Sequence, residues 1–254
     1  MSLRVVAAGA LAVATLGLGA CGDGEERTDT ITVFAAASLT EAFGELAAAF
    51  EAEHPGVTVR LSFAGSATLR TQVLEGAPAD VFASASPDEV ATLDAAGLVV
   101  EERALATNTL LVATGAYGID AFEDLALPGL RLVLAAEEVP AGRYARESLA
   151  LAGSDFAERV LANVRSNETN VRATLAKVEL GEADAAIVYA SDLQAADESV
   201  RAIAIPERFQ VAAEYRIALL SESDGARAFV AFATSPEGMA TLARHGFTAV
   251  GATP

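Results

Sequence analysis

The chain alternates apolar runs with amphipathic segments, and this alternation limits its possible folds more than any other feature. The first run, Ile31–Ala36, is almost continuously apolar, as expected for a strand that is buried on both faces of a sheet. The next apolar residues recur at helical spacing, at Leu39, Phe43, Leu46 and Phe50. Similar units follow to about residue 95, which predicts a parallel sheet covered by helices.

A glycine-rich break at Gly115 and Gly118 interrupts the alternation, which begins again at 130–135. A chain of 254 residues is long enough for one large domain or two small ones. The pattern therefore predicts an α/β protein. It leaves open whether the strands form one open sheet or two half-size α/β lobes.

The chain is acidic, with a formal net charge of -18, and 52% of its residues are hydrophobic. Its hydrophobic content is sufficient for a large core. The negative charge argues against nucleic-acid binding, because such binding depends on neutralising phosphates with basic side chains. An anionic ligand would have to be held by a local site, against the field of the whole protein.

The N-terminus has the features of a secretory signal. Residues 1–20 contain Arg4, then a short apolar run that is too short to span a membrane, then small residues. The sequence Leu18–Cys21 resembles the lipobox of bacterial lipoproteins, which implies cleavage before Cys21 and lipidation of this cysteine, the only one in the chain. The alternatives are an ordinary signal peptide or a retained anchor. Residues 21–30 would form a polar tether.

The sequence offers little support for an enzyme. The two histidines, His54 and His245, both lie where helices are expected to end, which favours a surface position. No nucleophile, zinc or phosphate-loop motif is present, and the single cysteine rules out a cysteine pair. Most carboxylates lie in first helical turns or on polar faces.

Junctions between strands and helices are the better candidates for a site, because ligands bind beyond the carboxyl ends of strands in open α/β sheets. Small or hydroxylated residues occupy four such junctions: Ser38, Gly65–Ser66, Ala141–Gly142 and Asn170–Val171. Tyr189 ends a further buried strand, and a buried phenol normally requires a partner. Taken alone, Ser38 is better explained as a helix cap, in a capping box with Glu41.

Five segments in collinear order resemble the molybdate-binding proteins of ABC importers. These segments are Ile31–Leu39, Gly76–Asp80, Val139–Gly142, Gly181–Tyr189 and Arg244–Phe247. The resemblance implies a type II periplasmic-binding-protein fold, with two α/β lobes around a ligand cleft. The first lobe would contain residues 30–108 and 211–254, and the second would contain residues 109–210.

The resemblance also implies the ligand-binding residues. Ser38 and Ser66 would donate hydroxyl and backbone hydrogen bonds to the oxyanion from the first lobe. Ala141 and Val171 would donate backbone N–H bonds from the second lobe, and Tyr189 would donate its phenolic proton. Since these donors are neutral and come from helix ends, they could hold an anion without a salt bridge.

Two positions qualify this expectation. Relatives often carry a serine-rich turn where this chain has Gly65, so a possible supporting hydroxyl is missing. Arg143 follows the junction at Ala141–Gly142 and is expected either to face solvent or to add positive charge at the rim of the cleft.

The predicted protein is a monomeric, lipid-anchored, extracytoplasmic solute-binding protein, located in the periplasm or on the outer face of the membrane. It would deliver molybdate, and also tungstate, to the membrane permease of an ABC importer, without a cofactor, a bare metal ion or nucleic acid. One alternative keeps the fold but changes the ligand to sulfate, thiosulfate or another oxyanion. The others are a secreted α/β lipoprotein enzyme and a non-catalytic scaffold or sensor.

Overall fold

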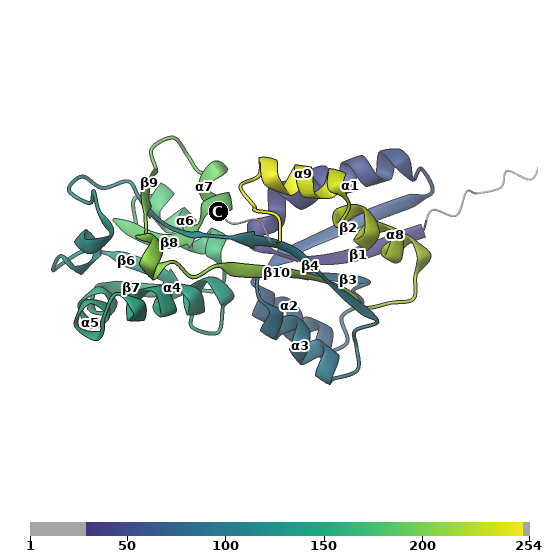
Figure 1. The fold of residues 1–254 in the computed structure, drawn as a ribbon, viewed down its shortest axis with the longest axis horizontal. Helices are drawn as coiled ribbons and strands as arrows, with labels where there is room; N and C mark the ends of the chain where they lie inside the picture. Colours follow the sequence, from purple (N-terminus) through teal and green to yellow (C-terminus); the bar gives the residue numbers. More distant parts are fainter. Residues whose placement is uncertain (1–28, 251–254) are drawn as a thin grey trace, which may run out of the picture.

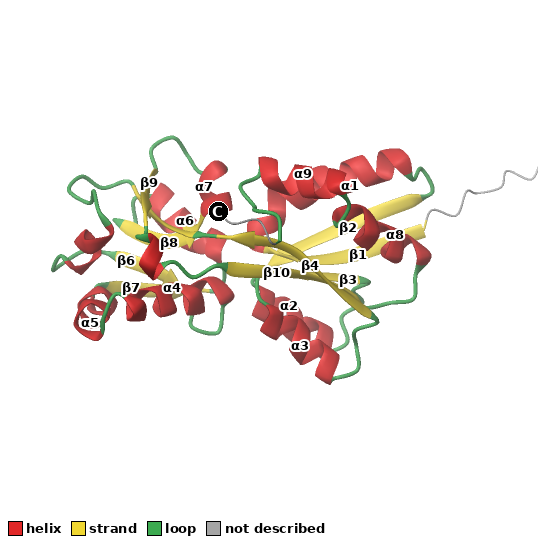
Figure 2. Ribbon diagram, in the orientation of Figure 1, coloured by secondary structure: helices red, strands yellow, loops and turns green. Residues whose placement is uncertain are grey.

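A computed structural model describes residues 29–250 and contains two five-stranded sheets, each covered by helices (Figures 1 and 2). This arrangement confirms the predicted α/β class and resolves the open alternative in favour of two lobes. The predicted signal peptide, residues 1–20, and Cys21 lie outside the described residues. Asp29 and Thr30, the last residues of the expected tether, already belong to the first strand.

The first sheet has the strand order β2-β1-β3-β10-β4. Strands β1, β2 and β3 are parallel, whereas β10 runs antiparallel to its neighbours β3 and β4. The strands are β1 (Asp29–Ala36), β2 (Val57–Ala64), β3 (Val81–Ser84), β4 (Glu101–Asn108) and β10 (Ala213–Leu219).

Helices cover both faces of this sheet (Figure 1). Helices α1 (Thr40–Glu53), α8 (Asp224–Ala233) and α9 (Pro236–Arg244) lie on one face, and α2 (Ser66–Leu74) and α3 (Pro87–Ala95) lie on the other. Phe50 and Phe229 are fully buried between α1 and α8, with ring centroids 5.3 Å apart in an edge-on arrangement. The apolar positions at helical spacing in α1 therefore pack as the sequence predicts.

The second sheet has the order β7-β6-β8-β5-β9, in which β6, β7 and β8 are parallel and β5 is antiparallel to β8. Its strands are β5 (Leu110–Thr114), β6 (Leu132–Ala135), β7 (Val164–Glu168), β8 (Ala185–Tyr189) and β9 (Arg201–Ala204). Its helices are α4 (Pro140–Leu151), α5 (Ser154–Ala162), α6 (Val171–Glu179) and the short α7 (Ala190–Gln194). Three 3₁₀ turns complete the described chain: η1 (Ala37–Leu39), η2 (Phe122–Ala126) and η3 (Glu207–Phe209).

The chain passes between the two sheets twice, from β4 to β5 and from β9 to β10. In the structure, Asn108 ends β4 and Leu110 begins β5, so that each strand joins a different sheet. Two crossings place the lobes side by side, with the ends of their strands directed toward a shared boundary (Figure 2).

Candidate functional site

A pocket lies between the lobes, where the carboxyl ends of parallel strands from both sheets meet. About 220 Å³ of unfilled space lies in this region, part of it open to solvent. The lining residues follow β1, β2 and β3 in the first lobe and β6, β7 and β8 in the second: Ala36, Ala37, Ser38, Gly65, Ser66, Ala85, Val139, Pro140, Ala141, Asn170, Val171 and Tyr189. This is the position at which open α/β sheets bind ligands.

All five residues selected from the sequence line this one pocket. They are almost fully buried: Ser38, Ser66, Ala141, Val171 and Tyr189. Four of them lie at the beginning of a helix or helical turn, and Tyr189 ends β8. The structure therefore gathers, from both lobes, the junctions that are dispersed over 152 positions of sequence, from residue 38 to residue 189.

Most helices that begin at the pocket have no side-chain cap. Ala36 precedes η1, Gly65 precedes α2 and Val139 precedes α4, and none of these residues has a side chain that caps its helix. In α6, the side chain of Asn170 accepts the N–H of Ala173 but not the N–H of Val171, which is the first residue of the helix. Helix N-termini that lack caps leave backbone donors free for a ligand.

Three helices whose N-termini lie outside the pocket lining provide a contrast, although α5 also starts there without a side-chain cap. The helices α3, α8 and α9 follow Ser86, Ser223 and Ser235, and each of these serine hydroxyls accepts an N–H of the first turn of its helix. The chain thus uses ordinary serine caps in these helices. The uncapped starts at the pocket concentrate backbone N–H groups and the positive ends of helix dipoles in one place.

The three hydroxyl groups at the pocket are also suited to donate. Ser66 Oγ accepts a hydrogen bond from the N–H of Ala85 at 3.1 Å, which leaves its own proton for another acceptor. Ser38 Oγ lies 2.7 Å from Tyr215 Oη. Tyr189 Oη is buried and has no hydrogen-bond partner among the described residues. An unpaired buried hydroxyl is costly, so this phenol marks a place for an acceptor.

The capping box predicted at Ser38 is wrong. Helix α1 begins at Thr40 after Leu39, and no side chain caps it. The Ser38 hydroxyl contacts Tyr215 instead, and the Glu41 carboxylate binds Arg172 of the second lobe. A short 3₁₀ turn separates the strand from the helix, which moves Ser38 out of the capping position and into the pocket wall.

Burial keeps the Tyr189 phenol neutral. Desolvation is the main cause that raises the pKa of Tyr189 well above its ordinary value, and the nearby Tyr215 adds to this effect. The phenol therefore keeps its proton and remains a hydrogen-bond donor at neutral pH.

Two glycines permit close approach at the pocket. A Cβ atom on Gly65 would lie 2.4 Å from the carbonyl oxygen of Thr169, which belongs to the other lobe. A Cβ on Gly142 would lie 2.1 Å from the carbonyl oxygen of Ala136, just after β6. Gly142 thus allows the start of α4 to pack against the end of its strand, and Gly65 allows the lobes to meet. The structure thus gives a steric reason for Gly65 at the position where relatives often carry a serine-rich turn.

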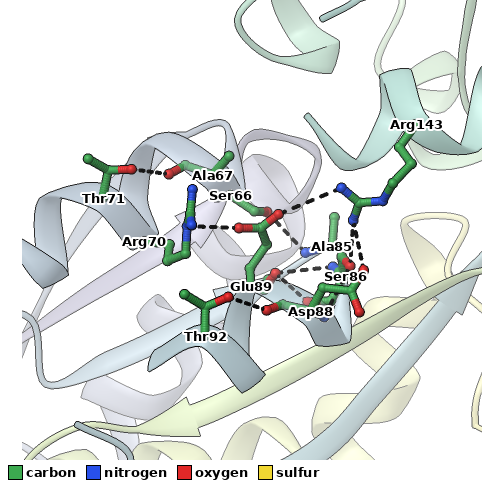
Figure 3. Close-up of polar contacts among 11 residues, drawn as sticks. Ser66, Ala67, Arg70, Thr71, Ala85, Ser86, Asp88, Glu89, Thr92 and Arg143 are labelled. Atoms are coloured by element: carbon green, nitrogen blue, oxygen red, sulfur yellow. Dashed lines mark hydrogen bonds and ion pairs between the residues drawn. The ribbon is translucent and has the colours of Figure 1, made fainter. Parts of the chain in front are cut away.

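Arg143 bridges the lobes at one side of the pocket. From α4, its Nη2 donates to Ser86 Oγ at 2.9 Å and lies 3.3 Å from Asp88 Oδ2 (Figure 3). The buried Glu89 carboxylate lies 3.9 Å from Arg143 and 3.0 Å from Arg70. Arg143 is therefore neither a free solvent-facing side chain nor a pocket-lining residue, but a contact between α4 and the start of α3.

Arg172 bridges the lobes at a second position. From α6, it binds Glu41 of α1 across the boundary and Asp192 of α7 within its own lobe, at 2.8 Å. Asp192 is fully buried and also accepts the N–H of Tyr189. Burial is the dominant influence and raises the pKa of Asp192 to about 7, although Arg172 acts in the opposite direction. This cluster of Arg172, Glu41 and Asp192 could not be predicted from the sequence, because its three members belong to separate elements.

Comparison with known proteins agrees with this geometry. The family of bacterial extracellular solute-binding proteins matches residues 31–248. The molybdate-binding protein ModA of Mycobacterium tuberculosis is 36% identical over 252 residues, which cover 93% of this chain and 94% of that protein. The chain belongs to the molybdate-binding family of extracellular solute-binding proteins.

Solved structures support the fold assigned to this family member. The periplasmic molybdate-binding protein of Azotobacter vinelandii matches with a TM-score of 0.77 and 20% identity, over 88% of this chain and 99% of that chain. The sulfate-binding protein SubI of Mycobacterium tuberculosis matches with a TM-score of 0.77 and 21% identity, over 88% of each chain. At these identities the similarity establishes the two-lobed periplasmic-binding-protein fold.

Membership in this family confirms that the chain is a binding protein rather than an enzyme and that its ligand is not a cofactor. Within residues 29–250, no group of three or more His, Cys, Asp or Glu side chains could hold a metal ion. In the same range, no helix has both the length and the apolar character needed to cross a bilayer.

The buried Asp192 leads to a prediction about stability. Because its folded-state pKa lies above the ordinary value of 3.8, the native protein binds this proton more tightly than the unfolded chain does. The contribution of Asp192 to stability is therefore complete below about pH 4 and is lost as the pH rises toward 7. We expect Asp192→Asn to flatten the pH dependence of the free energy of unfolding over this range, measured by urea denaturation.

The exposed Asp94, near the end of α3, supplies the matched control, because Asp94→Asn makes the same chemical change on the surface. It should leave the pH profile of the wild type unchanged. Parallel profiles for the wild type and Asp192→Asn would contradict the assignment of a raised pKa to Asp192.

Proposed function

We propose that this chain captures molybdate, and also tungstate, outside the cytoplasm and delivers it to the membrane permease of an ABC importer. The observation that carries this proposal is that one interlobe pocket is lined by all five residues, Ser38, Ser66, Ala141, Val171 and Tyr189. These residues would bind the anion through their hydroxyl and backbone N–H groups. The resemblance to relatives that are named for molybdate supports the choice of ligand.

The chemistry of the pocket suits a fully deprotonated oxyanion. Molybdate at neutral pH is a tetrahedral dianion that can only accept hydrogen bonds. The pocket offers helix N-termini and the Tyr189 hydroxyl, whose proton has no acceptor among the described residues. A protonated oxyanion such as hydrogen phosphate would place its own proton against these donors, at the cost of an unpaired polar group.

Several charge-assisted hydrogen bonds could supply useful affinity. Each contributes about 1.5–3 kcal/mol, and the total is reduced by the costs of association and closure. The remainder is consistent with a binding free energy of about -8 kcal/mol or more negative, which corresponds to a submicromolar dissociation constant. Neutral donors supply this energy without any salt bridge to the anion.

A second candidate ligand is sulfate, since the fold is shared with a sulfate-binding protein. Sulfate is also fully deprotonated, so the absence of an acceptor does not exclude it. Discrimination would depend on anion size, because a smaller tetrahedral anion cannot reach donors on both lobes at the same time. Molybdate is favoured here by the higher identity to molybdate-binding relatives.

We also propose that the protein is a monomer tethered to the membrane through lipid on Cys21, after removal of residues 1–20. The lipobox-like sequence Leu18–Cys21 supports this anchor. The lobes would comprise residues 30–108 with 211–254, and residues 109–210. An anchored protein would remain near the permease while its lobes open and close.

Ligand capture would involve closure of the lobes around the anion. The contacts of Arg143 with Ser86 and of Arg172 with Glu41 cross the boundary in the structure. The backbone at Gly65 also meets Thr169 there. These contacts can form only when the lobes are close together, so they stabilise the closed arrangement in which donors from both lobes surround the pocket.

Calorimetry of the mature domain with molybdate, tungstate, sulfate and phosphate tests the proposed function. We expect molybdate and tungstate to bind with similar, submicromolar affinity, and sulfate to bind at least tenfold more weakly, about 1.4 kcal/mol. Phosphate should bind much more weakly than sulfate, so that its affinity is measured only in competition experiments at high phosphate concentration. Sulfate binding as tight as molybdate would favour the second candidate, and no binding of any oxyanion would contradict the function.

Removal of single hydroxyl groups tests the site. Tyr189→Phe and Ser38→Ala should each weaken molybdate binding by about tenfold or more, because each removes a donor to a charged acceptor. The fully exposed Tyr117 provides a control, since Tyr117→Phe should bind normally. Normal binding by both site variants, with unchanged melting temperatures, would place the anion elsewhere.

Gly65→Ala tests closure. The added methyl group would collide with the Thr169 carbonyl only when the lobes are closed, since it belongs to a different lobe. We expect molybdate affinity to fall by about tenfold, while thermal stability without ligand changes little. Gly44 of α1 is the matched control, because a Cβ there would meet nothing within 4 Å. Equal affinity in Gly65→Ala and Gly44→Ala would show that closure tolerates the added atom.

A further inference from the structure

Tyr215 is a buried residue behind the pocket that the sequence did not single out. It lies on β10, is 1% exposed, and brings its Oη to 2.7 Å from Ser38 Oγ. Its ring packs edge-on against Tyr189, with centroids 5.9 Å apart, and against Phe247, at 5.2 Å. Packing on both sides fixes the phenol behind Ser38, while Tyr215 does not line the pocket itself.

The direction of the hydrogen bond between Tyr215 and Ser38 decides what Ser38 offers to a ligand. If Ser38 donates to the phenol, its oxygen lone pairs are free to accept a proton from the pocket. If Tyr215 donates to Ser38, the serine oxygen is already occupied as an acceptor, and its proton is available to the ligand. The distance of 2.7 Å between the two oxygen atoms fits both cases, so the surroundings of the phenol must decide between them.

The surroundings of the phenol favour donation by Tyr215. Desolvation raises its pKa well above the ordinary value, so that the phenol keeps its proton. Among the described residues, Ser38 Oγ is the one hydrogen-bond partner of the phenol, because the amide N–H of the neighbouring Asn108 donates to Ser191 Oγ at 2.8 Å. The Asn108 oxygen accepts the N–H of Thr109. Ser38 is therefore the acceptor left for the phenolic proton, which would otherwise be buried without a partner.

Ser66 shows the same arrangement on a second wall of the pocket. Its oxygen accepts the N–H of Ala85 at 3.1 Å, so that its proton is also free for the ligand. A donor behind each serine therefore occupies one of its two lone pairs and leaves the serine proton for the ligand. Behind Ser66 this donor belongs to the backbone, whereas behind Ser38 it is a side chain that substitution can remove.

We propose that Tyr215 is a specificity-determining residue, which fixes the Ser38 hydroxyl as a donor and so excludes oxyanions that carry a proton. This inference rests on the proposed function, since it concerns how the same pocket selects its anion. A deprotonated anion such as molybdate receives the Ser38 proton. Hydrogen phosphate would direct its own proton toward the Ser38 proton that Tyr215 holds in the direction of the pocket.

Tyr215→Phe separates this role from simple packing, because phenylalanine keeps the ring and removes only the hydroxyl. In the variant, the Ser38 hydroxyl can turn and accept a proton from the ligand. We expect the ratio of molybdate to phosphate affinity to fall by about tenfold. It should be measured by competition calorimetry at a pH above the second pKa of phosphate, where both anions are dianions.

Sulfate provides the internal reference, because it carries no proton under these conditions. The ratio of molybdate to sulfate affinity should remain within about twofold of the wild type, whereas a distorted pocket would change both ratios. The exposed Tyr117 is the control for the substitution, and Tyr117→Phe should leave both ratios unchanged. Circular dichroism and melting temperature establish that each variant is folded.

Ser38→Ala gives an independent reading that does not require a folded Tyr215→Phe protein. If Ser38 donates to the anion, its removal weakens molybdate and sulfate binding. If Ser38 accepts from the pocket, its removal leaves these two anions unaffected and weakens only phosphate. In the double variant, Tyr215→Phe should no longer alter the molybdate-to-phosphate ratio, because the hydroxyl whose direction it sets is absent.

Unchanged ratios in folded Tyr215→Phe, or phosphate-only weakening in Ser38→Ala, would overturn the role of Tyr215. Either result would leave the proposed function intact if the wild type binds molybdate. Failure of the wild type to bind molybdate would instead contradict the proposed function itself.

Discussion

Buried hydrogen-bond donors without acceptors are the constraint on which the rest of the structure depends. The Tyr189 hydroxyl and the uncapped starts of η1, α2 and α4 converge at the boundary between the lobes. Each such group carries a free-energy cost until an acceptor arrives. Two crossings of the chain make this convergence possible, because they direct the carboxyl ends of strands from both sheets toward one pocket. The protein thus gives up some local stability for a preformed set of hydrogen-bond donors.

The acidic composition sharpens this constraint, since a net charge of -18 repels any anion. Acidic groups around the cleft are paired with arginine: Glu41 and Asp192 with Arg172, and Glu89 with Arg70 and Arg143. These pairs neutralise the nearest negative charges while none of the arginines lines the pocket. The anion would therefore meet neutral donors in a local environment that is less negative than the protein as a whole.

The alternation of strands and helices was readable from the sequence because periodicity is a local property. The candidate residues could be selected for a related reason, since Ser38, Ser66, Ala141, Val171 and Tyr189 each stand at a strand end. Contacts between distant elements could not be read in this way. Ser38 meets Tyr215 across 177 positions, so its hydroxyl lost the capping role that its local sequence predicts. Arg143, Arg172 and Gly65 likewise gain their roles only when the lobes meet.

The balance of contacts across the cleft favours an anion as the main link between the lobes. Arg143 reaches Asp88, which is 79% exposed, and Arg172 reaches Glu41, which is 40% exposed. Ion pairs with such exposure contribute little to stability, because water competes for both charges. An anion in the pocket would instead hold helix ends from both lobes in a buried environment, where hydrogen bonds to charge are strong. Closure would then depend on the ligand, and the weak ionic contacts would let the lobes separate once the ligand leaves.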